Sequence, residues 1–270
     1  MEFSVANTKE EMGKLAAQTA AGFLTAAIAK KGVARLVLST GASQFAFFDA
    51  LLSDAPLAQG VDWGKVEVFH LDEYIGLPES HAASFRKYLK ERFTSKVALK
   101  KAALKAAHFI DGQGDVAGHI AELSAEINKA PVDLAMVGIG ENAHIAFNDP
   151  PADFDTVESF IVVNLDERCK KQQVSEGWFA SVQEVPKQAI TMTVFQIMKA
   201  NAIISVVPGK NKAEAVRDTL CAGKVTPKIP ATKLREHNCW HLFLDKESAA
   251  LLPAANLPAA LLPAAKVPAK

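Results

Sequence analysis

Short runs of apolar residues recur along the chain, separated by longer stretches that have the spacing of amphipathic helices. Apolar runs of this length are typical of strands that are buried on both faces of a sheet. Strands are predicted at 35–38, 66–69, 134–137, 161–165, 189–193, 202–207 and 242–244. Because they alternate with helices, the pattern predicts an α/β fold of the Rossmann-like, doubly wound type, with a mostly parallel sheet and helices on both faces.

The first predicted helix has a recognisable beginning and end. Thr8 has a side chain that can cap a helix, and Glu11 follows three residues later, as in a capping box. Gly32 is a residue type that commonly ends helices. Further helices are predicted at 44–52, 84–93, 115–129 and 194–199, whereas the basic stretch 96–105 is interpreted as a solvated linker.

Polar side chains gather directly after the strand predicted at 134–137. Gly138 and Gly140 allow the chain to turn sharply and allow a ligand to approach the backbone. The nine residues after Gly140 contain an imidazole, two carboxylates and two amides: Glu141, Asn142, His144, Asn148 and Asp149. Ligands of open α/β sheets bind beyond the carboxyl ends of strands, so this is a candidate site. A solvated junction between strand and loop explains the same spacing, because a lone GxG is weak evidence.

Two other predicted strands also end in polar residues. The strand at 66–69 is followed by an imidazole, two carboxylates and a phenol: His70, Asp72, Glu73 and Tyr74. The strand at 35–38 leads into small hydroxylated residues up to Ser43. Hydroxyls and backbone N–H groups at a helix N-terminus bind anions, most often phosphate. Ser43 alone is equally a helix cap, but three such strand ends favour a ligand site.

Composition and charge narrow the class of protein. Lys plus Arg and Asp plus Glu number 30 each, so the chain lacks the excess of positive charge expected of a nucleic-acid-binding protein. Cys169, Cys221 and Cys239 are widely spaced, without the pattern of a zinc site or a disulfide framework. No signal-peptide pattern is present, and no apolar run reaches the roughly 18 residues of a membrane span. We expect a cytoplasmic protein without nucleic-acid or membrane partners, and a homo-oligomer is compatible with the sequence.

The composition changes near the C-terminus. Residues 1–248 are predicted to form one domain, and residues 249–270 an appendage rich in Pro, Ala and Leu. Pro253, Pro258, Pro263 and Pro268 recur every five residues, which rules out a continuous helix there. The appendage is not expected to take part in catalysis.

Four motifs occur in the order found in the glucosamine-6-phosphate deaminase/isomerase family, which this chain resembles. HLDEYIGLPESHAASF is similar to the family signature, and GIGENAHIAFNDP is similar to its second motif, usually GxGxDGHIAFNEP. STGAS resembles the family's phosphate loop, and VPGKNKA resembles its later lysine-bearing segment. The resemblance runs from near residue 5 to about residue 247. The related 6-phosphogluconolactonases usually have DER instead of DEY and an ending like SLFP instead of AFNDP.

The resemblance implies an enzyme of the hydrolase class, a deaminase/isomerase of amino-sugar catabolism. It would convert glucosamine 6-phosphate to fructose 6-phosphate and ammonia, with no metal or organic cofactor. By this resemblance Asp72 moves a proton between C2 and C1, and His144 opens the sugar ring. The phosphate is implied to bind one loop and one lysine: Thr40, Gly41, Ala42, Ser43 and Lys212. Lys210 is the alternative lysine.

The chain departs from the family pattern at several candidate site residues. Asn142 occupies the position of the family's Asp, Ala143 that of a Gly, and Asp149 that of a Glu. An amide can orient an imidazole but cannot stabilise its protonated form as a carboxylate can. Glu141 is therefore a further candidate partner of the histidine. Gln173 lies where a basic residue is expected, so the phosphate contacts are predicted to differ.

Three other functions fit parts of this pattern. The same residues would serve another hexosamine phosphate, such as galactosamine 6-phosphate. A 6-phosphogluconolactonase is disfavoured by DEY and by AFNDP. A sugar-phosphate-binding sensor without enzymatic activity is the remaining alternative, because this fold also forms the effector domains of bacterial regulators; such regulators normally carry a helix-turn-helix ahead of the domain.

Overall fold

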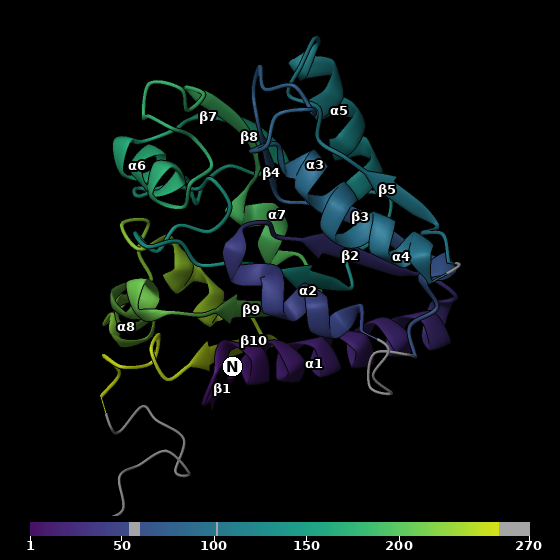
Figure 1. Cartoon of the computed structure of the whole chain (residues 1–270), viewed down its shortest axis with the longest axis horizontal. Coiled ribbons are helices and arrows are strands. Elements are labelled where there is room, and N and C mark those ends of the chain that lie inside the picture. The colour runs from purple at the N-terminus through teal and green to yellow at the C-terminus, as the bar shows by residue number, and fades with distance from the viewer. Residues whose placement is uncertain (54–59, 101, 254–270) are drawn as a thin grey trace, which may run out of the picture.

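A computed structural model describes residues 1–53, 60–100 and 102–253 (Figure 1). Its main element is a seven-stranded sheet in which every neighbouring pair of strands is parallel. The strands lie in the order β1 (Glu2–Ala6), β10 (Trp240–Asp245), β9 (Ala202–Val207), β6 (Leu134–Met136), β2 (Ala34–Leu38), β3 (Val66–His70) and β5 (Ala106–His108). The predicted parallel α/β sheet is confirmed.

Both faces of this sheet are covered by helices, as the sequence predicts. Leu36 and Leu38 of β2 belong to one apolar cluster and Val37 to another, because successive side chains of a strand point to opposite faces. One cluster includes residues of α1 (Lys9–Lys31), α2 (Phe45–Leu51), α3 (Phe85–Leu89) and α4 (Ser95–Leu99). The other includes residues of α5 (Val116–Ile127), α7 (Val194–Met198), α8 (Ala213–Cys221) and a 3-10 helix, Pro230–Glu236.

A second, three-stranded sheet is antiparallel and was not predicted. It contains β4 (Asp72–Tyr74), β8 (Gln188–Met192) and β7 (Phe160–Asn164), and α6 (Glu167–Ser175) packs beside it (Figure 1). The runs predicted at 161–165 and 189–193 are indeed strands, but they belong to this sheet. From Ile161 to Asn164 in β7, half-buried and exposed positions alternate, as expected of an antiparallel strand that is covered on one face.

The predicted start and end of the first helix are confirmed, but the basic stretch predicted as a linker is largely helical. Thr8 accepts a hydrogen bond from the backbone N–H of Glu11, and Gly32 ends α1 in the left-handed region with φ 77°. The stretch predicted as a linker is helical up to Leu99, because a π-helical turn at Lys90–Thr94 joins α3 to α4. Val97, an apolar residue close to three lysines, is buried and anchors this helix.

The order of the strands places a switch point beside β2. The chain builds outward from β2 through β3 to β5, then returns to the opposite side of β2 and builds β6, β9 and β10. Ligands of doubly wound sheets bind beyond the carboxyl ends of the strands at such a point. Among the described residues, no helix has the length and apolar character needed to cross a membrane.

The folded body extends past the boundary predicted at residue 248. Ala249 and Leu252 are buried in one of the two main clusters, and Ser248 donates its backbone N–H to Asp245 Oδ1 at 2.7 Å. The predicted domain therefore includes the first residues of the predicted appendage. Residues 254–270 of that appendage lie outside the described residues.

Truncation after Ser248 is expected to lower the free energy of unfolding, because it removes Leu252 from the core. Burial of a leucine side chain contributes about 1.5–3 kcal/mol. Truncation after Pro253 is the matched control, since it retains both buried residues. Thermal unfolding of the two truncates would measure the difference. Equal melting temperatures would show that Leu252 contributes nothing to stability.

Candidate active site

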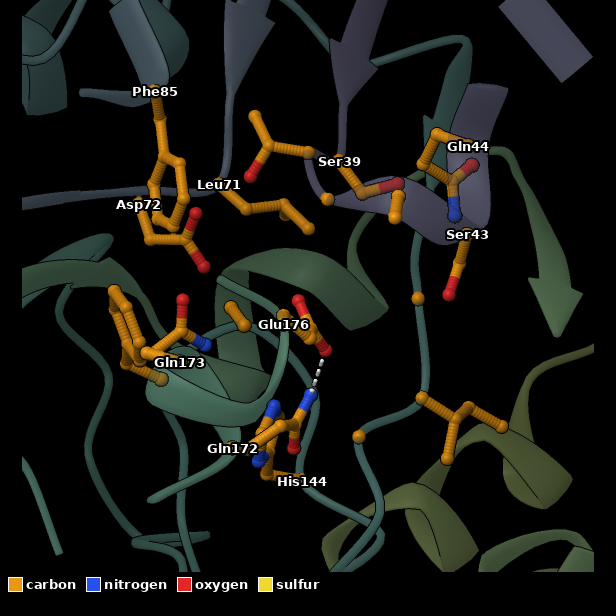
Figure 2. Close-up of a pocket in the computed structure, with 18 of the residues that line it drawn as sticks. Ser39, Ser43, Gln44, Leu71, Asp72, Phe85, His144, Gln172, Gln173 and Glu176 are labelled. Atoms are coloured by element: carbon orange, nitrogen blue, oxygen red, sulfur yellow. Dashed lines mark hydrogen bonds between the residues drawn. The ribbon is translucent and has the colours of Figure 1, made fainter. Parts of the chain in front are cut away.

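A pocket lies at the switch point, and the segments that follow β2, β3, β6 and β9 contribute to its wall together with α6 and the residues after it. Figure 2 shows the side chains of Asp72, His144 and Ser43 on different sides of this pocket. Every residue predicted to bind phosphate lines it: Thr40, Gly41, Ala42, Ser43 and Lys212. The four strand ends, far apart in the sequence, thus meet at one cavity.

Two turns of similar shape approach the pocket. Gly41 has φ 95° and precedes a 3-10 turn, Ala42–Gln44, that runs into α2. Gly209 has φ 90° and precedes a 3-10 turn, Lys210–Lys212, that runs into α8. These left-handed φ values favour glycine. Both turns lead into helix N-termini, where unpaired N–H groups favour anions.

Lys212 is the lysine that reaches the pocket, whereas Lys210 is exposed and does not line it. The side chain of Lys212 is buried, and burial lowers the pKa of its ammonium. The carboxylates of Glu176 and Glu141 partly offset this effect. A buried ammonium that has no direct ion pair within the described part of the chain is well suited to a mobile anion, because binding supplies its missing counter-charge.

Asp72 lies in β4 and is almost completely buried at the wall of the pocket. Burial, followed by the neighbouring charge of Glu73, raises the pKa of Asp72 to about 8. A carboxyl with a pKa near neutrality can both accept and return a proton.

The residues on either side of Asp72 have structural roles. Glu73 accepts hydrogen bonds from Ser84 Oγ and from the backbone N–H groups of Tyr74, Phe85 and Arg86, at 2.9–3.3 Å. It therefore ties β4 to the start of α3. His70 accepts a hydrogen bond from the N–H of Ile110, and burial lowers the pKa of its imidazole to about 3. Glu73 and His70 therefore help to hold the backbone on either side of Asp72 in place.

His144 meets Asp149 at the other side of the pocket. Nδ1 of His144 lies 3.1 Å from Oδ1 of Asp149, an ion-pair distance at which the two atoms do not form a hydrogen bond. Asn142 donates its side-chain amide to the same oxygen at 3.1 Å. Burial by itself raises the pKa of Asp149, but the contacts with His144 and Asn142 outweigh it, so the pKa lies below its usual value. The carboxylate is thus held ionised beside the imidazole.

The loop that carries His144 keeps an unusual backbone shape. Ala143 has φ 63°, a left-handed conformation that favours the glycine expected from the family pattern. Asn148 bonds the carbonyls of Ile145 and Met192, and the N–H of Phe147 donates to Thr191 Oγ1. These contacts attach the loop to β8.

Glu141 does not take the carboxylate position beside His144. Its Oε1 accepts a hydrogen bond from Asn211 Nδ2 at 2.6 Å, so its side chain leads to the turn that carries Lys212. Instead, the buried thiol of Cys169 lies near the pair of His144 and Asp149. Burial and the nearby carboxylates, Asp149 foremost among them, raise the pKa of this thiol. These three side chains have ligand atoms within 4.8 Å of one another and are the one group in the described chain that could hold a metal ion.

Helix α6 and the residues after it also contribute to the pocket, which the sequence did not predict. Gln172, Gln173, Glu176 and Trp178 all line the pocket. Gln173 is uncharged and cannot provide the cation expected at this position. Its side-chain oxygen accepts a hydrogen bond from the hydroxyl of Tyr74 at 2.8 Å. The stretch is too polar for hydrophobic periodicity to reveal a helix. The departure at Gln173 was its only signal.

Comparison with known proteins agrees with this arrangement. Residues 7–242 match the model of the family described as glucosamine-6-phosphate isomerases/6-phosphogluconolactonase. The glucosamine-6-phosphate deaminase of Thermoanaerobacter sp. (strain X514) is 36% identical over 246 residues, which cover 90% of this chain and 92% of that protein.

Two solved structures share the fold. A monomeric glucosamine-6-phosphate deaminase superposes with a TM-score of 0.81 at 27% identity, covering 93% of this chain and all of that one (100%). The 6-phosphogluconolactonase from Trypanosoma brucei superposes with a TM-score of 0.72 at 19% identity, covering 93% and 98% of the two chains. This chain therefore belongs to the family of glucosamine-6-phosphate isomerases and 6-phosphogluconolactonases.

Proposed function

We propose that this protein converts glucosamine 6-phosphate to fructose 6-phosphate and ammonia. The observation that carries the proposal is the meeting of two proton-transfer groups in one pocket with a site for phosphate. Asp72 and His144 line the pocket that also receives Lys212 and the turn at Gly41, and Asp149 contacts His144. Relatives that are named glucosamine-6-phosphate deaminase and are 30–36% identical to this chain support the same reaction.

Ring opening and the transfer of a proton from C2 to C1 each have a residue to perform them. His144 takes the proton from the C1 hydroxyl and delivers it to the ring oxygen as the sugar ring opens, and Asp149 stabilises the imidazolium that forms between the two transfers. Asp72 then removes the proton from C2 and delivers it to C1, which converts the aldose amine into a ketose imine. Water adds to C2 of the imine, and the C2–N bond breaks with release of ammonia. Proton transfers by positioned groups contribute roughly 10²–10⁴-fold each.

The addition of water makes the overall conversion a hydrolytic deamination, so we assign the enzyme to the hydrolase class. Its substrate carries a phosphate, whose charge prevents free passage through membranes. We therefore infer that it acts in the cytoplasm. The proposed steps call for no metal or organic cofactor, since the protons move between side chains, substrate and water.

Ammonia release tests the proposed reaction. Glucosamine 6-phosphate, galactosamine 6-phosphate and 6-phosphogluconolactone would be compared as substrates, with lactone hydrolysis followed in parallel. We expect ammonia and fructose 6-phosphate from the first substrate at the highest kcat/KM. Faster release from galactosamine 6-phosphate would assign the sister activity. Lactone hydrolysis without ammonia would favour the lactonase, and binding without any turnover would favour a sensor.

Lys212→Ala is expected to raise KM mainly, because the ammonium holds the phosphate in both ground and transition states. The loss of a charge-assisted hydrogen bond of about 1.5–3 kcal/mol corresponds to an increase of roughly 10- to 150-fold. Lys210→Ala is the matched control, since its exposed side chain does not line the pocket. Steady-state kinetics would measure both variants. An unchanged KM for Lys212→Ala would remove this lysine from the phosphate site.

A further inference from the structure

Glu176 brings an additional carboxylate into the pocket, one that the proposed mechanism does not use. It follows α6 directly, at the C-cap of that helix, and it lines the cavity. Figure 2 shows its side chain projecting into the space between Ser39, Asp72 and His144. The carboxylate therefore lies where the body of a sugar would lie, between the proton-transfer groups and the phosphate turn.

The position of this carboxylate is fixed by two donors. Gln172 Nε2 donates to Oε1 of Glu176 at 2.7 Å, and Trp178 Nε1 donates to Oε2 at 3.2 Å. Each oxygen thus accepts one hydrogen bond and keeps a lone pair for another donor, as an ionised carboxylate can. A side chain held at both oxygens loses little additional entropy when a ligand binds.

The charge balance of the pocket calls for a cationic partner. Among the described residues that line the cavity, Lys212 is the one lysine or arginine side chain. The charge of Glu176 acts on Lys212 in the free enzyme. A sugar phosphate brings about −1.5 to −2 charges near pH 7 and takes up Lys212, so Glu176 then weakens phosphate binding unless a further cation compensates it. No arginine compensates for Glu176 within the pocket, because the position expected to be basic is Gln173, which is bonded to Tyr74.

We propose that Glu176 binds the 2-ammonium group of the substrate and thereby selects amino-sugar phosphates over sugar phosphates with a 2-hydroxyl group. The assignment rests on the proposed function, since it takes Asp72 to act at C2, the carbon that bears the amine. Asp72 itself is a poor partner for the ammonium. Its pKa of about 8 leaves it mostly protonated at neutral pH in the free enzyme.

Calorimetry with two alditol phosphates tests this assignment without turnover. 2-Amino-2-deoxyglucitol 6-phosphate and glucitol 6-phosphate differ only in the amine or hydroxyl at C2. The parent enzyme is expected to bind the amine tighter by about 10- to 150-fold, the range of a charge-assisted hydrogen bond. In Glu176→Gln this ratio should fall close to one, through weaker binding of the amine.

Glu141→Gln is the matched control for charge. It also removes one negative charge that acts on Lys212, but Glu141 does not line the pocket. It should change the affinities for both alditols by the same factor and leave their ratio unchanged. Trp178→Phe keeps an aromatic ring but removes one donor to Glu176, so it should lower the ratio partially. This variant tests the assignment even if Glu176→Gln does not fold.

The outcomes separate this assignment from the proposed reaction. A ratio that Glu176→Gln leaves unchanged, or an equal change for both alditols, would overturn the role of Glu176. A parent that binds neither alditol would overturn this assignment together with the proposed substrate class. Selective binding of the amine by a parent that releases no ammonia would leave the assignment standing and refute the reaction.

Discussion

Asp72→Asn is expected to lower kcat by roughly 10²–10⁴-fold or more while changing KM little. The amide keeps the size of the carboxyl group but cannot remove a proton from C2. Binding should persist, because the substitution leaves the groups proposed to hold the phosphate, the turn at Gly41 and Lys212, unchanged. Steady-state kinetics and calorimetry with an alditol phosphate would measure the two effects separately. A kcat within about tenfold of the parent would remove Asp72 from the role of base.

The same carboxyl is expected to set the acidic limb of the pH profile. With a pKa of about 8, Asp72 is mostly protonated in the free enzyme at pH 7, and only its ionised form can remove the C2 proton. We therefore expect kcat/KM to rise with pH and to level off above about pH 8. A limb near the ordinary pKa of an aspartate would show that burial does not raise the pKa of this group.

The stability of Asp72→Asn provides a check on folding. A group whose pKa is higher in the folded than in the unfolded state binds more protons when folded, so its contribution to stability falls as pH rises. For Asp72 this fall covers the window from the ordinary aspartate pKa of 3.8 to about 8. An asparagine has no such dependence. We therefore expect the variant to melt no lower than the parent at pH 9, provided that the amide is accommodated.

Asp149→Asn is expected to lower kcat by about 10²-fold or more, because it leaves the imidazole without a charged partner. Asp149 is the carboxylate that contacts His144 at 3.1 Å, and it is held ionised there. The asparagine can still orient the ring but cannot stabilise its protonated form. The pH profile of kcat should therefore change in shape as well as in height. Glu141→Gln tests the alternative partner and should have a much smaller effect, since Glu141 bonds Asn211.

The opposite substitution, Asn142→Asp, tests whether Asp149 alone serves His144 or whether the histidine needs a second carboxylate at position 142. The side chain of Asn142 donates to Asp149 Oδ1 at 3.1 Å, so an aspartate there would bring two carboxylates into contact. Such a pair shares a proton, and one pKa rises strongly. We expect unchanged or lower turnover. A rise of about tenfold or more would show that Asp149 alone does not serve the histidine.

The strand ends of the site were predictable from the sequence because each combines two local signals. A buried parallel strand reads as a short apolar run, and the polar residues that follow it, such as Asp72 and His144, cannot be part of that core. Topology then brings the carboxyl ends together, whatever the side chains are. The doubly wound sheet and the residues on its loops therefore followed from periodicity, motif order and the resemblance.

The tertiary structure decided which of the neighbouring polar groups meet. Glu141, Asn142 and Asp149 were all candidate partners of His144 along the chain, but only Asp149 and Asn142 lie beside one another at His144. Their directions depend on the left-handed backbone at Ala143 and on hydrogen bonds to β8, 44 residues away along the chain. No local pattern encodes such contacts.

Local sequence patterns likewise did not predict the antiparallel sheet or α6. Glu176 faces the pocket because Gln172 and Trp178 hold its carboxylate, at the end of a polar helix that no apolar period marks. The sequence by itself thus determined the fold class and the loops that carry the chemistry, since burial of apolar strands is a property of local segments. The partners of each charge were decided only by tertiary structure, because the direction of a side chain depends on contacts with distant parts of the chain.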